Sequence, residues 1–445
     1  MNRLTTLSAS GDGDARTDAQ PTRRRVLQTL AGVGVGVLFG VERGKASTTS
    51  GGDRQWKFQT GNLVWSSPTV VDGTVFVASD DRNVYALDAA TGDEHWHFET
   101  RSGVWSSPTV TDTTVFVGSY DGNVYALDAT TGEERWHFET GDERWFFETS
   151  ERVRSSPTVA DGIVFVGSSD DNVYALDAAS GDEYWRFEAS RSVNSSPTVA
   201  NGTVFVGSAD NHVYALDAAT GDEHWHFETG DSVLSSPTVV DGTVFVGSHN
   251  HNVYALDAAT GEVQWHFETG DNVRSSPTVV GGRLFIGSYD GNVYALDAVT
   301  GDEHWHFETG RSVHSSPTVV DRTVFVGSLD DNVYALDAAT GDEHWHFETG
   351  RGVNSSPTVV DGTVFVGSFD GRVYALDAGV DGSSECSRTQ LGTLGHHDKL
   401  ATADEEIDIE DATDEQLPGF GVGAALAGIG TAGYLLKRRQ DDIDH

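Results

Sequence analysis

This sequence contains pairs of histidines separated by one residue, a spacing that could support metal binding. Each pair brackets a tryptophan, and the pairs are His95/His97, His224/His226, His304/His306 and His344/His346. Alternate residues of a strand lie on one face, so both imidazoles of a pair could clamp a metal ion such as zinc. A zinc site needs further ligands, and none is adjacent. We therefore interpret the pairs as cover for the outer edge of the fold.

Acidic tips and the single cysteine are the other candidates for chemistry. Asp170-Asp171-Asn172 is typical of these tips, but it lacks the alternating oxygen ligands of a calcium loop. Asp and Asn accept left-handed turn conformations, so the tips are predicted to be hairpin turns. Cys386 has no second cysteine with which to form an internal disulfide. We expect no metal ligands and no catalytic residue in these groups.

A repeated string containing a tryptophan indicates the elements that carry these residues. It reads alanine, any residue, aspartate, two residues, threonine or serine, glycine, three residues, tryptophan. Complete copies run from Ala86, Ala126, Ala175, Ala215, Ala255, Ala295 and Ala335. An eighth copy begins at Ala375 and lacks its tryptophan, and Trp56 stands alone before the first copy. Such a period indicates one small unit repeated along the chain.

The unit between Trp225 and Trp265 predicts four strands. WHFET, VLSSPTVV, TVFVGS and VYALDA are rich in β-branched and aromatic residues, and Asp-Gly marks a tight hairpin. No stretch between Trp56 and Leu376 has the apolar spacing of a helix. Four-stranded antiparallel units stack radially into a β-propeller. The Ser-Ser-Pro segment occurs eight times, so we predict an all-β, eight-bladed propeller.

Ring closure accounts for the incomplete eighth copy. The strand around Trp56 would become the fourth strand of the last blade, which removes two exposed sheet edges. One irregularity follows Trp136, because Trp145 repeats the pattern nine residues later. We expect Trp136 to take the regular position and Trp145 to lie in a longer loop.

The tryptophan string resembles the docking motif of the pyrroloquinoline-quinone (PQQ) repeat propellers over residues 56 to about 378, with YALDAATGDEHW close to an ideal copy. The resemblance implies that each tryptophan packs between neighbouring blades, with an alanine and a glycine, such as Ala86 and Gly92 for Trp96, leaving room. The implied docking residues are Trp56, Trp96, Trp136, Trp185, Trp225, Trp265, Trp305 and Trp345. Propellers of the tryptophan–aspartate type are a weaker match, because their Gly-His and Trp-Asp marks are missing.

PQQ-repeat propellers also include quinoprotein dehydrogenases, so an enzyme has to be considered. Resemblance to these enzymes would imply long insertions, calcium-bound PQQ, a catalytic aspartate and commonly an adjacent cysteine pair. None of these is identifiable here, and near-identical repeats supply little of the asymmetry that a cofactor site needs. We expect no cofactor, with PQQ and calcium belonging only to the alternative of a degenerate dehydrogenase.

Differences between the repeats point to one end of the propeller. The residue before Ser-Ser-Pro varies as Trp65, Trp105, Arg154, Asn194, Leu234, Arg274, His314 and Asn354. The tip between the second and third strands also varies, and includes Tyr120, Tyr289 and Phe369. In an up-and-down blade both connections emerge on the same face, so these residues form a candidate partner-binding face. Trp, Tyr and Arg are common interface anchors, although drift in exposed loops is an alternative explanation.

Both ends of the chain carry export and anchoring signals. Residues 22–28, TRRRVLQ, resemble the twin-arginine export motif and precede a short apolar run. Gln416 to Leu436 carry no charge and are followed by Lys437-Arg438-Arg439, which fits one membrane span with the basic end inside. Pro418-Gly419-Phe420 resembles the archaeal sorting signal cut by archaeosortases. The acidic extension after Arg439 departs from that pattern, so lipid exchange is less secure than membrane attachment.

Charge restricts the classes of partner. The net charge is −41, and Lys+Arg number 28 against 69 Asp+Glu. This balance is typical of a salt-loving archaeon, and such a chain needs salt to screen its self-repulsion. Nucleic acid has the same sign of charge and is excluded as a partner.

The predicted organisation has five parts. They are a signal segment (1–46), the propeller (47–379), an acidic disordered linker (380–416), a transmembrane or sorting segment (417–439) and an acidic tail (440–445). We expect a non-catalytic propeller on the outer face of the cell membrane, which binds a protein, glycan or other envelope component. The alternatives are the degenerate dehydrogenase and a purely structural envelope spacer.

Overall fold

A computed structural model describes residues 51–111, 113–141 and 152–384. Its regular elements are all short β-strands. Blade 1 holds β2 (Thr69–Val71), β3 (Thr74–Ala78), β4 (Asn83–Asp88) and β5 (Glu94–Glu99). Blade 2 holds β6 (Thr109–Thr111), β7 (Thr114–Gly118), β8 (Asn123–Asp128) and β9 (Glu134–Glu139). Blade 3 holds β10 (Thr158–Ala160), β11 (Ile163–Gly167), β12 (Asn172–Asp177) and β13 (Glu183–Glu188). Blade 4 holds β14 (Thr198–Ala200), β15 (Thr203–Gly207), β16 (His212–Asp217) and β17 (Glu223–Glu228).

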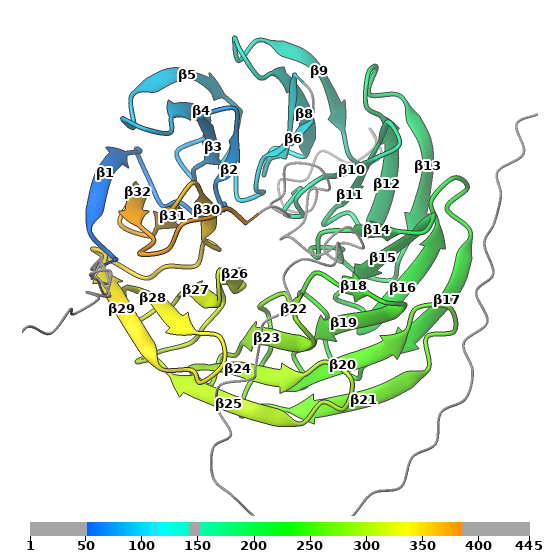
Figure 1. The fold of residues 1–445 in the computed structure, drawn as a ribbon. Coiled ribbons are helices and arrows are strands. Elements are labelled where there is room, and N and C mark those ends of the chain that lie inside the picture. The colour runs from blue at the N-terminus through cyan, green and yellow to red at the C-terminus, as the bar shows by residue number, and fades with distance from the viewer. Residues whose placement is uncertain (1–50, 112, 142–151, 385–445) are drawn as a thin grey trace, which may run out of the picture. The chain divides into compact units, whose positions relative to one another are not determined.

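The second half of the ring repeats the same plan. Blade 5 holds β18 (Thr238–Val240), β19 (Thr243–Gly247), β20 (Asn252–Asp257) and β21 (Val263–Glu268). Blade 6 holds β22 (Thr278–Val280), β23 (Arg283–Gly287), β24 (Asn292–Asp297) and β25 (Glu303–Glu308). Blade 7 holds β26 (Thr318–Val320), β27 (Thr323–Gly327), β28 (Asn332–Asp337) and β29 (Glu343–Glu348). Blade 8 holds β30 (Thr358–Val360), β31 (Thr363–Ser368), β32 (Arg372–Asp377) and, from the start of the chain, β1 (Arg54–Gln59). The eight-bladed, four-stranded antiparallel propeller is confirmed (Figure 1).

The first strand of the chain closes the ring, as expected. β1 pairs antiparallel with β32, which places Trp56 opposite Ala375. The equivalent pair within blade 5 is Ala255 opposite Trp265. The small alanine leaves space for the indole of the neighbouring strand, so the last blade reproduces the geometry of the continuous ones.

Tight turns join the first two strands of the blades. In blade 5 the turn residues Asp241 and Gly242 have φ of 49° and 75°. Two consecutive positive φ angles are the signature of a type I′ hairpin, whose twist matches that of its strands. The Asp-Gly pairs were predicted to be hairpins for this reason.

The Ser-Ser-Pro-Thr segment forms two closed rings of hydrogen bonds around the innermost strands. The amide of the second serine in each blade donates to the hydroxyl of its counterpart in the next blade, from Ser67 to Ser107 (2.9 Å) and finally from Ser356 back to Ser67 (2.8 Å). The threonine hydroxyl donates to the next proline carbonyl, closing with Thr358 on Pro68 (2.6 Å). Sequence reasoning used this segment only as a marker for counting blades. Its function in the fold is to satisfy buried polar groups across every blade boundary.

The tryptophans of the repeated string dock each blade onto the next. The indole of Trp225, in blade 4, donates from Nε1 to the Ala258 carbonyl of blade 5 (3.0 Å). It covers Gly261, where a Cβ would lie 2.8 Å from the indole Cδ2. The other seven indoles make the same contact, donating to the carbonyls of Ala89, Ala129, Ala178, Ala218, Ala298, Ala338 and Ala378. Trp136 takes the docking position in blade 2, and Trp145 lies outside the described residues.

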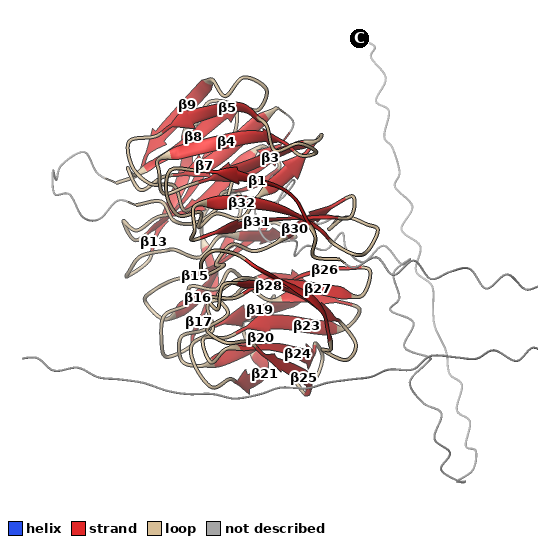
Figure 2. Cartoon of the chain, turned by 90° about the vertical axis from the view of Figure 1, so that its left-hand side faces the viewer, coloured by secondary structure: helices blue, strands red, loops and turns tan. Residues whose placement is uncertain are grey.

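The blades have two ends that differ in what they carry. One end carries the connections between the second and third strands of the blades, such as β3–β4 in blade 1, and the links from one blade to the next. We call this end the tip face and the opposite end the turn face. Both ends of the described chain are at the turn face, because Gly52 bonds Asp377 and Ser384 bonds Val359. Figure 2 shows the strands and loops of the blades from the side.

The predicted signals at both ends of the chain lie outside the described residues. This holds for the signal segment, residues 385–416 of the predicted acidic linker, the apolar segment 417–439 and the last residues. The prediction of a disordered linker from residue 380 is wrong for residues 380–384, because Val380 packs against the core of the last blades and the Ser384 amide donates to the Val359 carbonyl. In residues 51–111, 113–141 and 152–384 there is no helix of a length and apolar character that would cross a membrane.

Candidate functional site

Residues that vary between repeats meet across blade boundaries on the tip face. The tip side chain of one blade contacts the residue before Ser-Ser-Pro in the following blade: Asp80 with Trp105, Tyr120 with Arg154, Ser169 with Asn194, Tyr289 with His314 and Phe369 with Trp65. The residue before Ser-Ser-Pro leads into the innermost strand of its blade, and the tip residue follows the second strand. The innermost strands surround the axis of the ring (Figure 1). We call Phe369, Trp65, Trp105, Tyr120, Arg154, His249, Arg274, Tyr289 and His314 the axial cluster.

Four aromatic rings form a continuous stack through blades 8, 1 and 2. Trp65 and Trp105 are parallel, with ring centroids 4.0 Å apart and planes at 11°. The Phe369 ring lies 4.3 Å from that of Trp65 at an angle of 51°, and the Tyr120 ring lies 4.6 Å from that of Trp105 at an angle of 36°. Both tryptophans are half-buried and pack against these neighbours.

Arginine extends this stack into blade 3. The Arg154 guanidinium lies 5.4 Å from the Trp105 ring centre and 5.2 Å from that of Tyr120. Arg152 lies 5.0 Å from the Tyr120 ring. Burial raises the pKa of the Tyr120 phenol, while Arg154, Arg152 and Arg274 oppose the rise. Arg274 belongs to blade 6, opposite blade 2, so its charge acts across the axis of the ring.

Histidines of blades 5 and 7 occupy the other side of the axis. The His314 ring stacks on Tyr289 at 3.9 Å, and its Nδ1 lies 3.1 Å from Oδ1 of Asn354. Burial and the nearby Arg274 together lower the pKa of His314 to about 4, against the hydrogen bond with Asn354, which raises it. Burial also lowers the pKa of His249. Both imidazoles are therefore neutral at pH 7, and Arg154 and Arg274 supply the positive charge of the cluster.

The remaining predicted face residues are placed around this cluster. Asn194 accepts a hydrogen bond from the Ser169 hydroxyl (3.0 Å), and Leu234 is half-buried at the equivalent position of blade 5. A cavity of about 440 Å³ opens on the tip face between blades 6 and 7, lined by Tyr289, Arg311, Ser312 and Leu329 among others.

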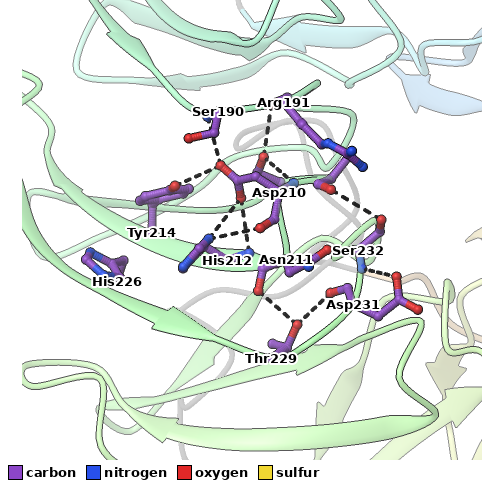
Figure 3. A network of polar contacts seen from close by, with 12 residues as sticks. Ser190, Arg191, Asp210, Asn211, His212, Tyr214, His226, Thr229, Asp231 and Ser232 are labelled. Atoms are coloured by element: carbon purple, nitrogen blue, oxygen red, sulfur yellow. Dashed lines mark hydrogen bonds and ion pairs between the residues drawn. The ribbon is translucent and has the colours of Figure 1, made fainter.

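The acidic tips serve the fold. In blade 4 one Asp210 oxygen accepts hydrogen bonds from the Ser190 amide (2.9 Å) and the Tyr214 hydroxyl (2.8 Å), and the other accepts from the His212 amide (3.1 Å) (Figure 3). Burial acts to raise the pKa of Asp210, but these hydrogen bonds outweigh it and the pKa lies below its usual value. The carboxylate fixes the tip to the link from the preceding blade, so its oxygens are already engaged.

The histidine pairs lie on the outermost strands and contact carboxylates there. His97 Nδ1 is 2.7 Å from Glu94 Oε1, and the same contact recurs at His226, His306 and His346. His95 lies 4.0 Å from Asp88. Among the residues that the structure describes, no group of three or more His, Cys, Asp or Glu side chains is arranged to hold a metal ion.

The axial residues do not fit a calcium-bound quinone. Calcium requires several oxygen ligands. The carboxylate of Asp80, beside the axial cluster, already accepts a hydrogen bond from Trp105 Nε1 (2.9 Å). Trp65 and Trp105 stack on each other, and Phe369 and Tyr120 pack against them, so both indoles are already engaged where a planar cofactor would have to stack. We therefore derive no reaction step through PQQ.

Arg152 belongs to this environment but was not among the predicted face residues, whereas His249 is one of the variable tip residues. At the position of Arg152 the other repeats carry Leu63, Gly103, Ser192, Ser232, Asn272, Ser312 and Gly352. That contrast is visible in the sequence and could have identified Arg152. The contact between Trp65 and Phe369 could not have been found in this way, because the two residues come from opposite ends of the chain.

Comparisons with known proteins agree with this architecture. The sequence profile of the family described as outer membrane protein assembly factor BamB matches residues 43–143, 138–239, 231–319 and 291–385, and the PGF-CTERM motif matches residues 417–439. No curated protein matches the chain.

Solved structures of different function share the fold. BamB from Moraxella catarrhalis is 21% identical with a TM-score of 0.63, and the match covers 73% of this chain and 99% of that one. The computationally designed Ika8 protein is 18% identical with a TM-score of 0.65, again over 73% and 99% of the two chains. Quinohemoprotein alcohol dehydrogenase from Comamonas testosteroni is 19% identical with a TM-score of 0.60, over 74% and 77%. At these identities the similarity concerns the fold alone.

Proposed function

Because this chain belongs to the family described as outer membrane protein assembly factor BamB, we propose that it is a non-catalytic binding propeller of the cell surface. The PGF-CTERM motif at residues 417–439 indicates a surface-anchored C-terminus. Export by the twin-arginine route and a halophilic, archaeal origin are parts of the same proposal. They rest on the arginine motif at residues 22–28 and on the net charge of −41.

The axial cluster carries the proposal. Four buried side-chain polar atoms lack a hydrogen-bond partner within the described residues, and all four are on the tip face: Trp65 Nε1, Tyr120 Oη, Arg154 Nε and His249 Nε2. Buried polar groups are normally paired, because an unmade hydrogen bond costs about 1–3 kcal/mol. Their concentration on one face, where the repeats differ, is typical of a surface that a partner completes.

The position of the chain ends is compatible with this assignment. Residues 51 and 384 are both at the turn face, opposite the axial cluster. A tether that starts at the turn face leaves the tip face open to a partner.

Crosslinking on intact cells in molar salt tests the proposal, followed by capture of the propeller and identification of its partners. The variant is Trp65→Leu with Trp105→Leu, because the equivalent position of blade 5 already carries Leu234. The control is Tyr184→Leu, which removes an exposed aromatic ring from β13 on the outer edge. We expect the wild type and the control to retain a specific partner that the double variant loses. An identical set of partners for all three proteins would refute a binding function of this face.

The alternative of a quinoprotein dehydrogenase has its own test. The purified protein supplied with PQQ and Ca²⁺ should neither bind the quinone stoichiometrically nor reduce a dye with alcohols. Turnover with bound PQQ would overturn the non-catalytic assignment.

A further inference from the structure

The unpaired atoms of the axial cluster are mainly hydrogen-bond donors. Trp65 Nε1 and Arg154 Nε can only donate, and the Tyr120 hydroxyl can do so. The eight docking indoles provide the internal comparison, because each of them donates to a backbone carbonyl. A group that completes the cluster must therefore supply acceptors.

The local charge favours an anionic acceptor. Arg154 and Arg274 approach the axis from blades 3 and 6, and neither makes an ion pair within the described residues. The titratable neighbours are Tyr120, His249 and His314, with the carboxylates Asp80, Asp231 and Asp271 nearby. Asp80 already accepts from Trp105. These two guanidinium groups are positive charges in a protein of net charge −41.

The shape of the cluster selects against flat ligands. Phe369, Trp65, Trp105 and Tyr120 pack against one another, and the polar group of Trp65 that this packing leaves without a partner is its buried Nε1–H. This packing opposes stacking of a sugar or a planar cofactor on these indoles. A carboxylate accepts hydrogen bonds through edges and pairs with the fork of an arginine.

We propose that the axial cluster binds the carboxylates of an acidic peptide segment, with Arg154, Arg274 and Trp65 Nε1 as donors. A peptide is favoured over a single small anion because the two guanidinium groups belong to blades 3 and 6, on different sides of the axis. One extended chain can present a carboxylate to each of them. The inference rests on the proposed binding function and specifies the chemistry of its partner.

Titration of the full chain with a synthetic peptide of eight alternating Asp and Glu residues tests this, in molar KCl to screen general repulsion. An Asn/Gln peptide of equal length is the probe control, and sulfate and succinate are separate arms. The variant Arg154→Gln with Arg274→Gln is matched by Arg191→Gln with Arg351→Gln, which removes the same charge from exposed arginines of the tip face. We expect at least tenfold weaker binding of the acidic peptide by the first pair, as the loss of one charge-assisted hydrogen bond implies. The control pair should bind as the wild type does.

The outcomes separate this inference from the proposed function. Equal weakening by both pairs would refute the axial site, and succinate or sulfate binding as tightly as the peptide would refute the peptide. If the wild type ignores the acidic peptide while the tryptophan variant still loses its cellular partner, the carboxylate assignment is wrong and the binding function stands. If the tryptophan variant retains that partner, the binding function itself is wrong.

Discussion

Gly261→Ala should show how much the docking of one tryptophan contributes to stability. Gly261 has φ of 73°, and a Cβ there would lie 2.8 Å from the Trp225 indole. Gly242 in the same blade has φ of 75°, but a Cβ there would meet nothing within 4 Å. Gly242→Ala is thus a control with the same backbone penalty and no contact with an indole.

The magnitudes follow from these two environments. A left-handed backbone costs either alanine about 1–2 kcal/mol. At Gly261 the indole must also shift, which adds about 1–3 kcal/mol of overpacking. The shift weakens the hydrogen bond from Trp225 to the Ala258 carbonyl, worth about 1 kcal/mol. Gly261→Ala should therefore lower the free energy of unfolding by about 2–4 kcal/mol more than Gly242→Ala.

Urea unfolding at constant molar salt, followed by tryptophan fluorescence, measures this difference. A similar loss for both variants would show that the indole adapts freely and that docking contributes little. A larger loss for Gly242→Ala would contradict the assignment of these turns altogether.

Three further predictions address the turns, the closure and the buried histidine. Arg322 has φ of 62° where most other blades carry glycine, so Arg322→Gly should raise the unfolding free energy by about 1 kcal/mol, and an unchanged urea midpoint would contradict this. Deletion of residues 51–60 removes β1 and exposes the edge of β32, so the thermal midpoint should fall, whereas an unchanged melt would reject closure by this strand. Because the pKa of His314 falls from 6.5 to about 4 on folding, the folded protein binds fewer protons between these values, and stability should decrease by up to about 3 kcal/mol as the pH drops through 6.5 towards 4. His314→Asn, which introduces the residue that blade 8 carries at the equivalent Asn354, should reduce that decrease in urea melts at pH 7 and pH 4.5. An equal pH dependence of the variant and the wild type would argue against a neutral buried imidazole.

Repetition made the architecture readable from the sequence. The spacing from Ala255 to Trp265 predicts a strand, a tight turn and a second strand, and that local pattern recurs around the ring. The missing tryptophan after Ala375 and the unpaired Trp56 together predict closure, because only one strand can fill the vacant edge. These features depend on residues close in sequence or on a count of repeats.

The tertiary structure alone decided which variable side chains meet. Trp65 and Trp105 are 40 residues apart and stack because neighbouring inner strands converge on the axis. Phe369 reaches Trp65 only through ring closure, and Arg274 acts on Tyr120 from the opposite blade. Periodicity specifies a position within a blade, whereas the partner of a side chain at the axis depends on the number of blades and the closure of the ring. The sequence therefore indicated the face, and the closed ring determined the contacts, burial and charge that make it a candidate site.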